Sequence, residues 1–172
     1  MLRHGSYRDL MSTEIDWSAV AHEFEWNGSL RDMYVHDTSV TEWQVVLDAI
    51  RTRYPPLTFL AGGVPSELPE IAAEVFPLWA RGTPPVLGFS VGGVQVGCHF
   101  FTPDEIEFDL DPREVTGPDQ LRAILTFLGT LSMLTAKPAV LTPENVSDEP
   151  IFRADPISGD AQYVPPPSRP AA

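Results

Sequence analysis

Four carboxylates alternate with apolar residues in the stretch EIEFDLD at residues 105–111. Because successive side chains of a β-strand point to opposite faces, a strand here presents its acids on one face and its apolar residues on the other. Acids two apart on a strand face lie about 7 Å apart, within the Debye length of about 8 Å at physiological salt, so they repel one another. A basic partner would relieve this repulsion. The predicted binding residues are Glu105, Glu107, Asp109 and Asp111.

Two other interpretations of this acidic strand stay open. Charge on a solvated face also keeps an edge strand from pairing with another chain. A metal site is the third interpretation, but hard cations need several converging oxygens, and carboxylates along a straight strand diverge. Proline cannot donate to a ladder, so Pro103 is expected at the start of the strand and Pro112 at its end. We expect an edge-type strand.

Two of the four histidines could act together. His22 and His36 are expected on the two strands of one hairpin, so they could approach each other. With Asp32 or Asp37 they could bind a metal ion or transfer protons. This arrangement supports an alternative function as a small hydrolase or metal-dependent enzyme. The histidines lack the spacing of a zinc motif, so no metal ligand is predicted.

The remaining reactive residue types do not form a catalytic motif. Cys98 is the only cysteine, which excludes an internal disulfide, and its apolar surroundings predict a buried core residue. His99 follows it directly, but neighbours in a strand point to opposite faces and make a poor nucleophile–base pair. No serine lies in a nucleophile elbow, and the paired glycines lack the lysine of a phosphate-binding loop. We therefore predict no catalytic residue and no cofactor.

The first half of the chain carries signals for a hairpin and a helix. Asn27-Gly28 favours a two-residue turn between strands at residues 22–26 and 29–36. Ser39 and Glu42 form a capping box ahead of apolar residues at helical spacing, which predicts a helix over residues 40–53. A short strand at residues 57–60 and a short helix around residues 69–75 follow, where Pro77 would break or kink the helix.

The second half predicts a three-stranded meander and a second long helix. Gly92-Gly93 joins strands at residues 86–91 and 94–101, and the acidic strand is the third. The second helix begins at residues 116–119, and residues 139–141 form a final short strand. The helix carries a wide apolar stripe that is either core or a dimer interface. The stripe consists of Leu121, Ile124, Leu125, Leu128, Leu131 and Leu134.

Hairpins without regular βαβ repeats predict an α+β fold. We expect a mainly antiparallel sheet, made of two hairpins plus the acidic edge-type strand, with two long helices packed on one face. Residues 1–16 are expected to be a loose N-terminal arm and residues 17–145 a single α+β domain. Residues 146–172 are rich in proline and are expected to be a C-terminal tail that is dispensable for folding.

The charge balance narrows the partners. The 172 residues carry a net charge of −13, which argues against binding nucleic acid or an anionic membrane surface. The same charge favours a basic protein partner, because opposite charge speeds encounter. The first residues lack the apolar region of a signal peptide, and no apolar run is long enough to span a membrane, so we expect a cytoplasmic protein.

A small, acidic, cofactor-free α+β domain is similar in composition to many bacterial immunity proteins, which block basic toxins. The similarity concerns composition and not a motif, and it implies an inhibitor-type protein. The main hypothesis is a non-enzymatic protein-binding domain, monomeric or homodimeric, whose acidic strand docks a basic partner. The alternatives are the small hydrolase or metal-dependent enzyme described above, and a structural or self-associating module held together by its apolar helix.

Overall fold

The computed structural model describes residues 14–167, and most of the expected arm at residues 1–16 lies outside this range. The strands are β1 (Arg31–His36), β2 (Thr58–Ala61), β3 (Val64–Pro65), β4 (Val86–Val91), β5 (Val94–Thr102), β6 (Glu105–Leu110), β7 (Ala139–Pro143), β8 (Phe152–Ala154) and β9 (Ala161–Tyr163). The α-helices are α1 (Trp17–Val20), α2 (Val40–Arg53) and α3 (Pro118–Thr135), and the 3-10 helices are η1 (Ala21–Phe24), η2 (Ala72–Glu74), η3 (Phe76–Arg81) and η4 (Pro112–Glu114).

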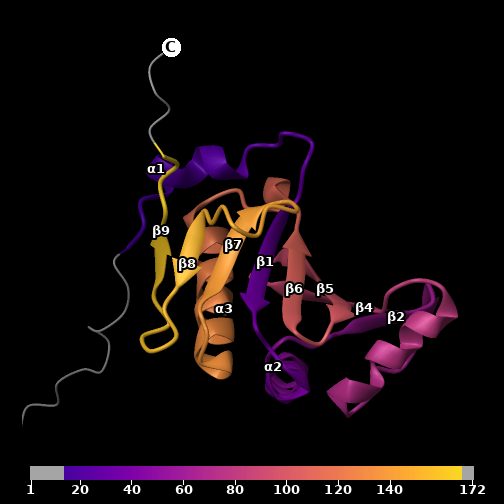
Figure 1. Cartoon of the computed structure of the whole chain (residues 1–172). Coiled ribbons are helices and arrows are strands. Elements are labelled where there is room, and N and C mark those ends of the chain that lie inside the picture. The colour runs from indigo at the N-terminus through magenta and orange to yellow at the C-terminus, as the bar shows by residue number, and fades with distance from the viewer. Residues whose placement is uncertain (1–13, 168–172) are drawn as a thin grey trace, which may run out of the picture.

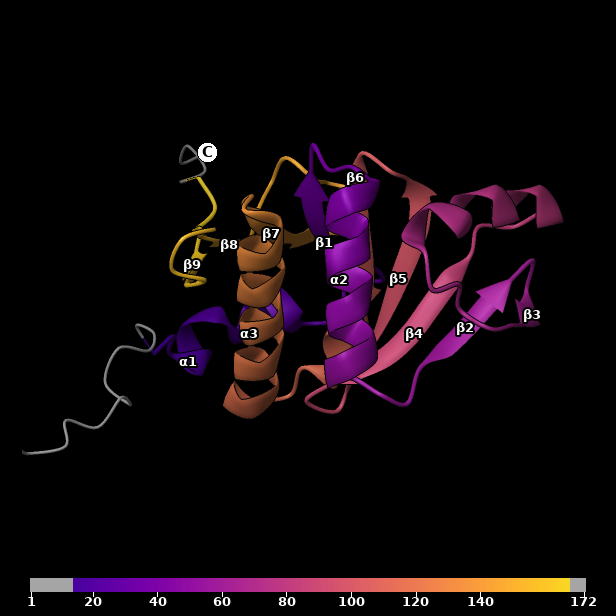
Figure 2. The ribbon, with the colours of Figure 1, turned by 90° about the horizontal axis from the view of Figure 1, so that it is seen from below.

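The nine strands form one antiparallel sheet in the order β3-β2-β4-β5-β6-β1-β7-β8-β9. Helices α2 and α3 lie side by side on one face of this sheet (Figures 1 and 2). The predicted α+β fold with two long helices on one face is therefore confirmed. Within residues 14–167, no helix covers the other face of the central strands (Figure 1).

Helix α2 begins and ends where the sequence predicts. The Ser39 side chain accepts from the amide of Thr41, and the Glu42 side chain reaches back to the Ser39 amide 2.9 Å away, which completes the capping box. Its apolar stripe packs into the core, where the Trp43 ring stacks on Phe100 with 4.8 Å between the ring centroids. Local chemistry and tertiary packing agree along this helix.

Helix α3 buries its apolar stripe against the protein's own sheet. Of the six residues in the stripe, Leu121, Ile124, Leu128 and Leu131 are buried and the other two are partly exposed. A β-carbon on Gly129 would lie 2.0 Å from the carbonyl oxygen of Gly159 in the turn between β8 and β9. Only glycine permits this close approach. The stripe is therefore core, and little of it is available for a dimer interface.

The acidic strand β6 lies inside the sheet, between β5 and β1. The prediction of an edge-type strand was therefore wrong. Pro103 precedes the strand and Pro112 begins η4 after it, so the two prolines bound the strand as predicted. The alternation itself is confirmed, since Ile106, Phe108 and Leu110 are buried in the core.

The predicted first hairpin does not form. Residues 21–24 belong to η1, and β1 pairs instead with β6 and β7. The buried Arg31 holds the connection in place, because its guanidinium donates to the carbonyls of Glu23 and Glu25 at 2.8 and 3.1 Å and to the Asn27 side chain at 3.3 Å. Long-range pairing and this buried cation outweigh the local turn signal at Asn27-Gly28.

The segment from residue 146 to residue 164 is not a separate tail. β8 pairs with β7 and β9 pairs with β8, and the amide of Val164 donates to the carbonyl of Ile151 at 2.8 Å. Phe152 is fully buried. The prediction of a tail over residues 146–172 was wrong for this segment, because its strands are too short to show a period of two clearly. The expected helix near residues 69–75 is replaced by η2 and η3, with Pro77 inside η3.

Candidate functional site: the acidic face of the sheet

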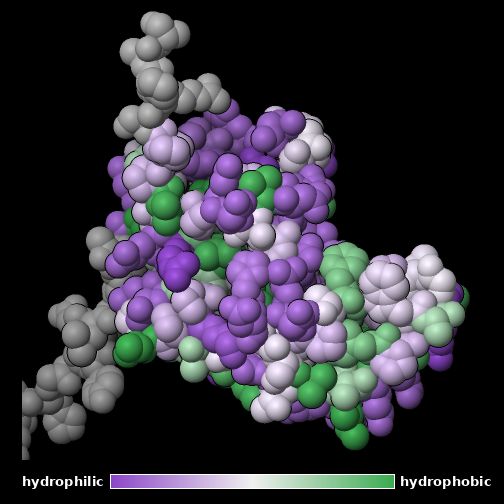
Figure 3. Space-filling view, in the orientation of Figure 1, coloured by the Kyte–Doolittle hydropathy of each residue, from purple (hydrophilic) through white to green (hydrophobic). Residues whose placement is uncertain are grey.

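The helix-free side of the central strands carries a cluster of ionisable side chains. We call this cluster the acidic face. It arises because alternate residues of β1, β5 and β6 point into the core under α2 and α3, which turns the residues between them outward. Figure 3 shows a predominantly hydrophilic surface over these strands. The acidic face consists of Asp32, Tyr34, His36, His99, Glu105, Glu107 and Asp109.

The register of the sheet determines which of these residues are neighbours. Tyr34 on β1 and His99 on β5 both lie opposite Glu107, one on each side of it. Asp32 lies directly opposite Asp109. Two like charges in this position destabilise a sheet, so the fold accepts electrostatic repulsion at its centre.

Two histidines form hydrogen bonds with acids of the face. His36 Nδ1 lies 2.8 Å from Glu105 Oε2, and His99 Nε2 lies 2.7 Å from Asp109 Oδ2. Burial lowers the pKa of His99, but the hydrogen bond and charge of Asp109 and the charge of Glu107 outweigh burial and raise it above its ordinary value. The charged form of His99 is therefore favoured.

Asp32 is the most buried acid of the face. Its Oδ2 accepts from the Tyr34 hydroxyl at 2.9 Å and from the amide of Asn145 at 2.7 Å. Burial raises the pKa of Asp32 despite these two hydrogen bonds, and burial together with Asp32 raises the pKa of Tyr34. Tyr34 consequently stays protonated and remains a hydrogen-bond donor.

Glu107 is at the centre of the electrostatic strain. Burial and the neighbouring charge of Asp32 raise its pKa to about 7, with further contributions from Glu105 and Asp109, while His99 opposes the shift. Between residues 14 and 167, no lysine or arginine forms an ion pair with any of the four acids of the face. Across the sheet from Glu107, the successive paired residues are Tyr34 on β1, Val140 on β7 and Arg153 on β8. Arg153 is therefore three strands away from Glu107.

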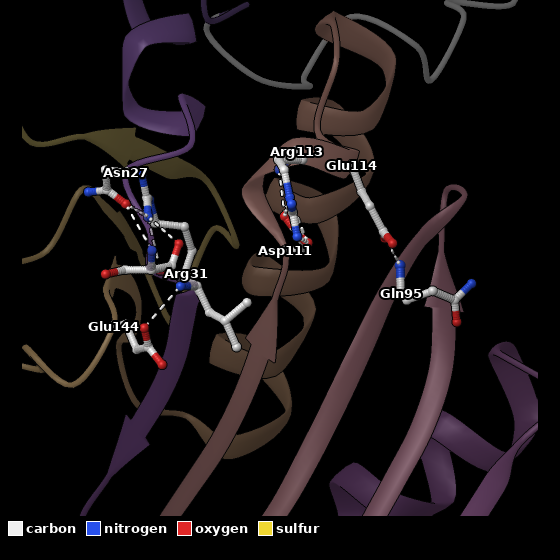
Figure 4. A network of polar contacts seen from close by, with 9 residues as sticks. Asn27, Arg31, Gln95, Asp111, Arg113, Glu114 and Glu144 are labelled. Atoms are coloured by element: carbon white, nitrogen blue, oxygen red, sulfur yellow. Dashed lines mark hydrogen bonds and ion pairs between the residues drawn. The ribbon is translucent and has the colours of Figure 1, made fainter.

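The fourth predicted binding residue, Asp111, lies outside this cluster. It follows the end of β6, where its side chain accepts from the amide of Arg113 at 2.9 Å and from the guanidinium of Arg113 at 2.6 and 3.0 Å (Figure 4). The hydrogen bond from Arg113 lowers the pKa of Asp111. Its charge is already compensated, and the structure thus brings together three of the four predicted residues.

Gly97 on β5 makes room for the acids. A β-carbon at this position would lie 2.6 Å from Asp109 Oδ1 and 3.4 Å from His99 Nε2. Any side chain here would therefore displace the carboxylate that holds His99. The sequence alone does not place Tyr34, His99 or Gly97 in the site. Their positions depend on the alternation within each strand together with the pairing of strands that are distant in the sequence.

The alternative histidine site is not assembled. His22 lies in η1, where its Nε2 atom is 3.2 Å from Glu23 Oε1. His36 instead pairs with Glu105 on β6. The two histidines were expected on paired strands, and that expectation was wrong because the hairpin does not form. Over the described part of the chain, no group of three or more His, Cys, Asp or Glu side chains is arranged to hold a metal ion. Cys98 is buried and faces away from His99, as predicted.

Two exposed aromatic rings border the acidic face, and we call them the aromatic ledge. Phe101 follows His99 on the same side of β5, and the two rings are parallel, with centroids 5.3 Å apart and 3° between their planes. Trp79 in η3 meets Phe101 edge-on at 6.1 Å, and its indole N–H donates to the carbonyl of Phe100 at 2.6 Å. In Figure 3 the surface becomes paler and greener toward β2 and η3.

A separate cavity of about 440 Å³ lies away from the acidic face, between α3 and the turn that joins β8 and β9. Leu125, Thr130 and Met133 line its α3 side, and Gly159 and Ala161 line the other. Ser158 and Asp160 also line this side, where the amide of Asp160 donates to the Ser158 hydroxyl oxygen at 3.1 Å.

In the described residues, no helix is long and apolar enough to cross a membrane. Comparison of the chain with protein-family models, with curated proteins and with solved structures finds no match.

Proposed function

We propose that this protein is a non-enzymatic protein-binding domain whose acidic face docks a basic partner. The observation that carries the proposal is the half-buried Glu107, whose pKa is raised to about 7 beside three other acids. A lysine or arginine from a partner would favour the ionised form of Glu107 and relieve the repulsion across the face.

The composition and the placement of the acids support the proposal that this protein is an inhibitor of a basic protein, as immunity proteins are. The acids stand on the middle strands of a nine-stranded sheet, which keeps them pre-organised and limits the entropy lost on binding. The net charge of −13 disfavours nucleic acid and anionic membranes. We place the protein in the cytoplasm, as a monomer or a homodimer.

An acid–base enzyme is the second candidate, since a carboxyl group with a pKa of about 7 is suited to proton transfer at neutral pH. His99 lies opposite Glu107, but Asp109 already holds its Nε2 atom. The acidic face is an open surface of a sheet, where water is not excluded from a reaction. The geometry therefore favours binding over catalysis.

The proposal is tested with a charge variant and a matched control. Glu105→Gln, Glu107→Gln and Asp109→Asn together remove three charges from the face. Glu67→Gln, Glu70→Gln and Glu74→Gln together remove three charges from exposed acids on the η2 side of the molecule. Proteins retained from a host extract by the wild-type protein are purified, and each is titrated against the three forms by calorimetry at low and high salt.

The expected partner binds the control variant as it binds the wild-type protein. It binds the face variant more weakly, chiefly through slower association, and with a flatter salt dependence. Equal weakening in both variants would indicate a general effect of net charge. Unchanged affinity in the face variant would leave the acidic face as a solvated surface, against the proposal.

A further inference from the structure

The aromatic ledge adds a chemical preference to the acidic face. Phe101 and Trp79 are 45% and 43% exposed, although large aromatic side chains of this kind are often covered. The parallel stack of Phe101 on His99 joins the ledge to the acids, because His99 is held by Asp109. Any partner on the acidic face near β5 therefore meets a ring surface as well as carboxylates.

The register places the ring beside two specific acids. His99 lies opposite Glu107 and Thr102 lies opposite Glu105, with a bulge in β5 between these pairs. Phe101 falls between the two pairs and stands on the same side of the sheet as His99. A planar cation lying on the exposed part of the Phe101 ring would have the carboxylates of Glu105 and Glu107 within its neighbourhood.

The opposite end of β6 shows how this protein holds such a cation. The guanidinium carbon of Arg113 lies 4.0 Å from the ring centroid of Trp26, while its nitrogens donate to both carboxylate oxygens of Asp111. A guanidinium is flat, so it can stack on a ring and bind a carboxylate in its own plane at once. The compact ammonium of lysine has no flat face to stack.

We propose that the acidic face selects arginine over lysine in its basic partner, with the guanidinium stacked on Phe101 and bound by Glu105 and Glu107. This inference rests on the proposed function and specifies the partner's contact residue. The aromatic ledge and the acids offer the same two kinds of group as Trp26 and Asp111, a ring and carboxylates, with the cation supplied by the partner.

Two synthetic peptides of equal charge test the preference. N-acetylated, C-amidated hexaarginine and hexalysine are titrated by calorimetry at 50 mM NaCl, where screening is weak. They are titrated into the wild-type protein, two Phe101 variants and the triple variant Glu105→Gln, Glu107→Gln and Asp109→Asn. Phe101→Leu removes the ring, and Phe101→Tyr keeps it. The folding of each variant is checked by its melting temperature.

The wild-type protein is expected to bind hexaarginine about 2–5-fold more tightly than hexalysine, the range that an exposed cation–π contact provides. Phe101→Leu should bring this ratio close to one, chiefly by weakening the binding of hexaarginine. Phe101→Tyr should preserve the ratio.

Equal affinity for the two peptides, or a ratio that survives in Phe101→Leu, overturns the arginine preference and leaves the docking proposal intact. Binding of both peptides that is unaffected by the triple variant Glu105→Gln, Glu107→Gln and Asp109→Asn contradicts the proposed function itself. The two failures are therefore distinguishable in one set of titrations.

Discussion

At the scale of single residues, Glu107 connects the fold to the proposed function. The register of the sheet places Glu107 beside Tyr34 and His99, and its burial there raises its pKa to about 7. A raised pKa means that the folded protein binds this proton more tightly than the unfolded chain does. Ionised Glu107 therefore reduces the stability of the free protein, and this is the strain that a partner's cation would remove.

The pH dependence of stability tests this strain. The ordinary pKa of the glutamate is 4.5, and in the folded protein it is about 7. The stabilisation that protonated Glu107 gives the folded protein is therefore fully present below pH 4.5 and is lost as the pH rises through about 7. Glu107→Gln cannot ionise, so its melting temperature should exceed that of the wild-type protein at pH 8 by at least about 2 °C, the lower end of the shift for roughly 1 kcal/mol in a domain of this size.

At pH 4.5 to 5 the difference between Glu107→Gln and the wild-type protein should be much smaller. Glu70→Gln is the control, because Glu70 is exposed and its loss changes the net charge by the same amount. The explanation fails when the Glu107→Gln difference is the same at both pH values, or when Glu70→Gln produces an equal gain at pH 8.

At the scale of elements, the strands β8 and β9 make residues 152–163 part of the fold. β8 and β9 extend the sheet beyond β7, and the turn between them packs its Gly159 carbonyl against Gly129 of α3. Phe152 is fully buried and stacks with Phe24 of η1, with 6.4 Å between the ring centroids. Residues 152–163 therefore connect η1 and α3 to the same sheet.

Phe152→Ala measures how strongly this segment stabilises the fold. Removal of a fully buried phenylalanine side chain should lower the free energy of unfolding by about 3–5 kcal/mol in urea denaturation. Ile157→Ala in the same segment is the control, since Ile157 is 91% exposed and its loss should change stability by less than about 0.5 kcal/mol. A Phe152→Ala variant as stable as the wild-type protein would show that the segment does not pack on the body.

At the scale of the whole molecule, the sequence predicted what local chemistry determines. The capping box at Ser39 and the apolar period predicted α2, and Gly92-Gly93 predicted the β4–β5 hairpin. The alternation in residues 105–111 placed Glu105, Glu107 and Asp109 on one side of a strand. These features depend on neighbours within a few residues, so a single sequence is enough to find them.

Features set by distant pairing could not be predicted in this way. β1 lies between β6 and β7, and only this register brings Asp32 and Tyr34 to the acids of β6. Arg31 is buried and bound to backbone carbonyls, and its neighbours in the sequence do not indicate this. Asp111 belongs to the same alternation as the other acids, but the neighbouring Arg113 removes it from the site. Long-range register, and not composition, assembles the acidic face.

The number of protons released on binding tests whether a cationic ligand docks at the acidic face. Hexaarginine is titrated at pH 7.0 in two buffers that differ in ionisation enthalpy, and the heat difference gives the protons released. A cation at the acidic face lowers the pKa of Glu107 from about 7, so the wild-type protein should release a fraction of a proton on binding. Glu107→Gln should release clearly less, while the triple variant Glu67→Gln, Glu70→Gln and Glu74→Gln should match the wild-type protein. Equal release from Glu107→Gln and the wild-type protein, or no release from either, would contradict docking of cations at this face.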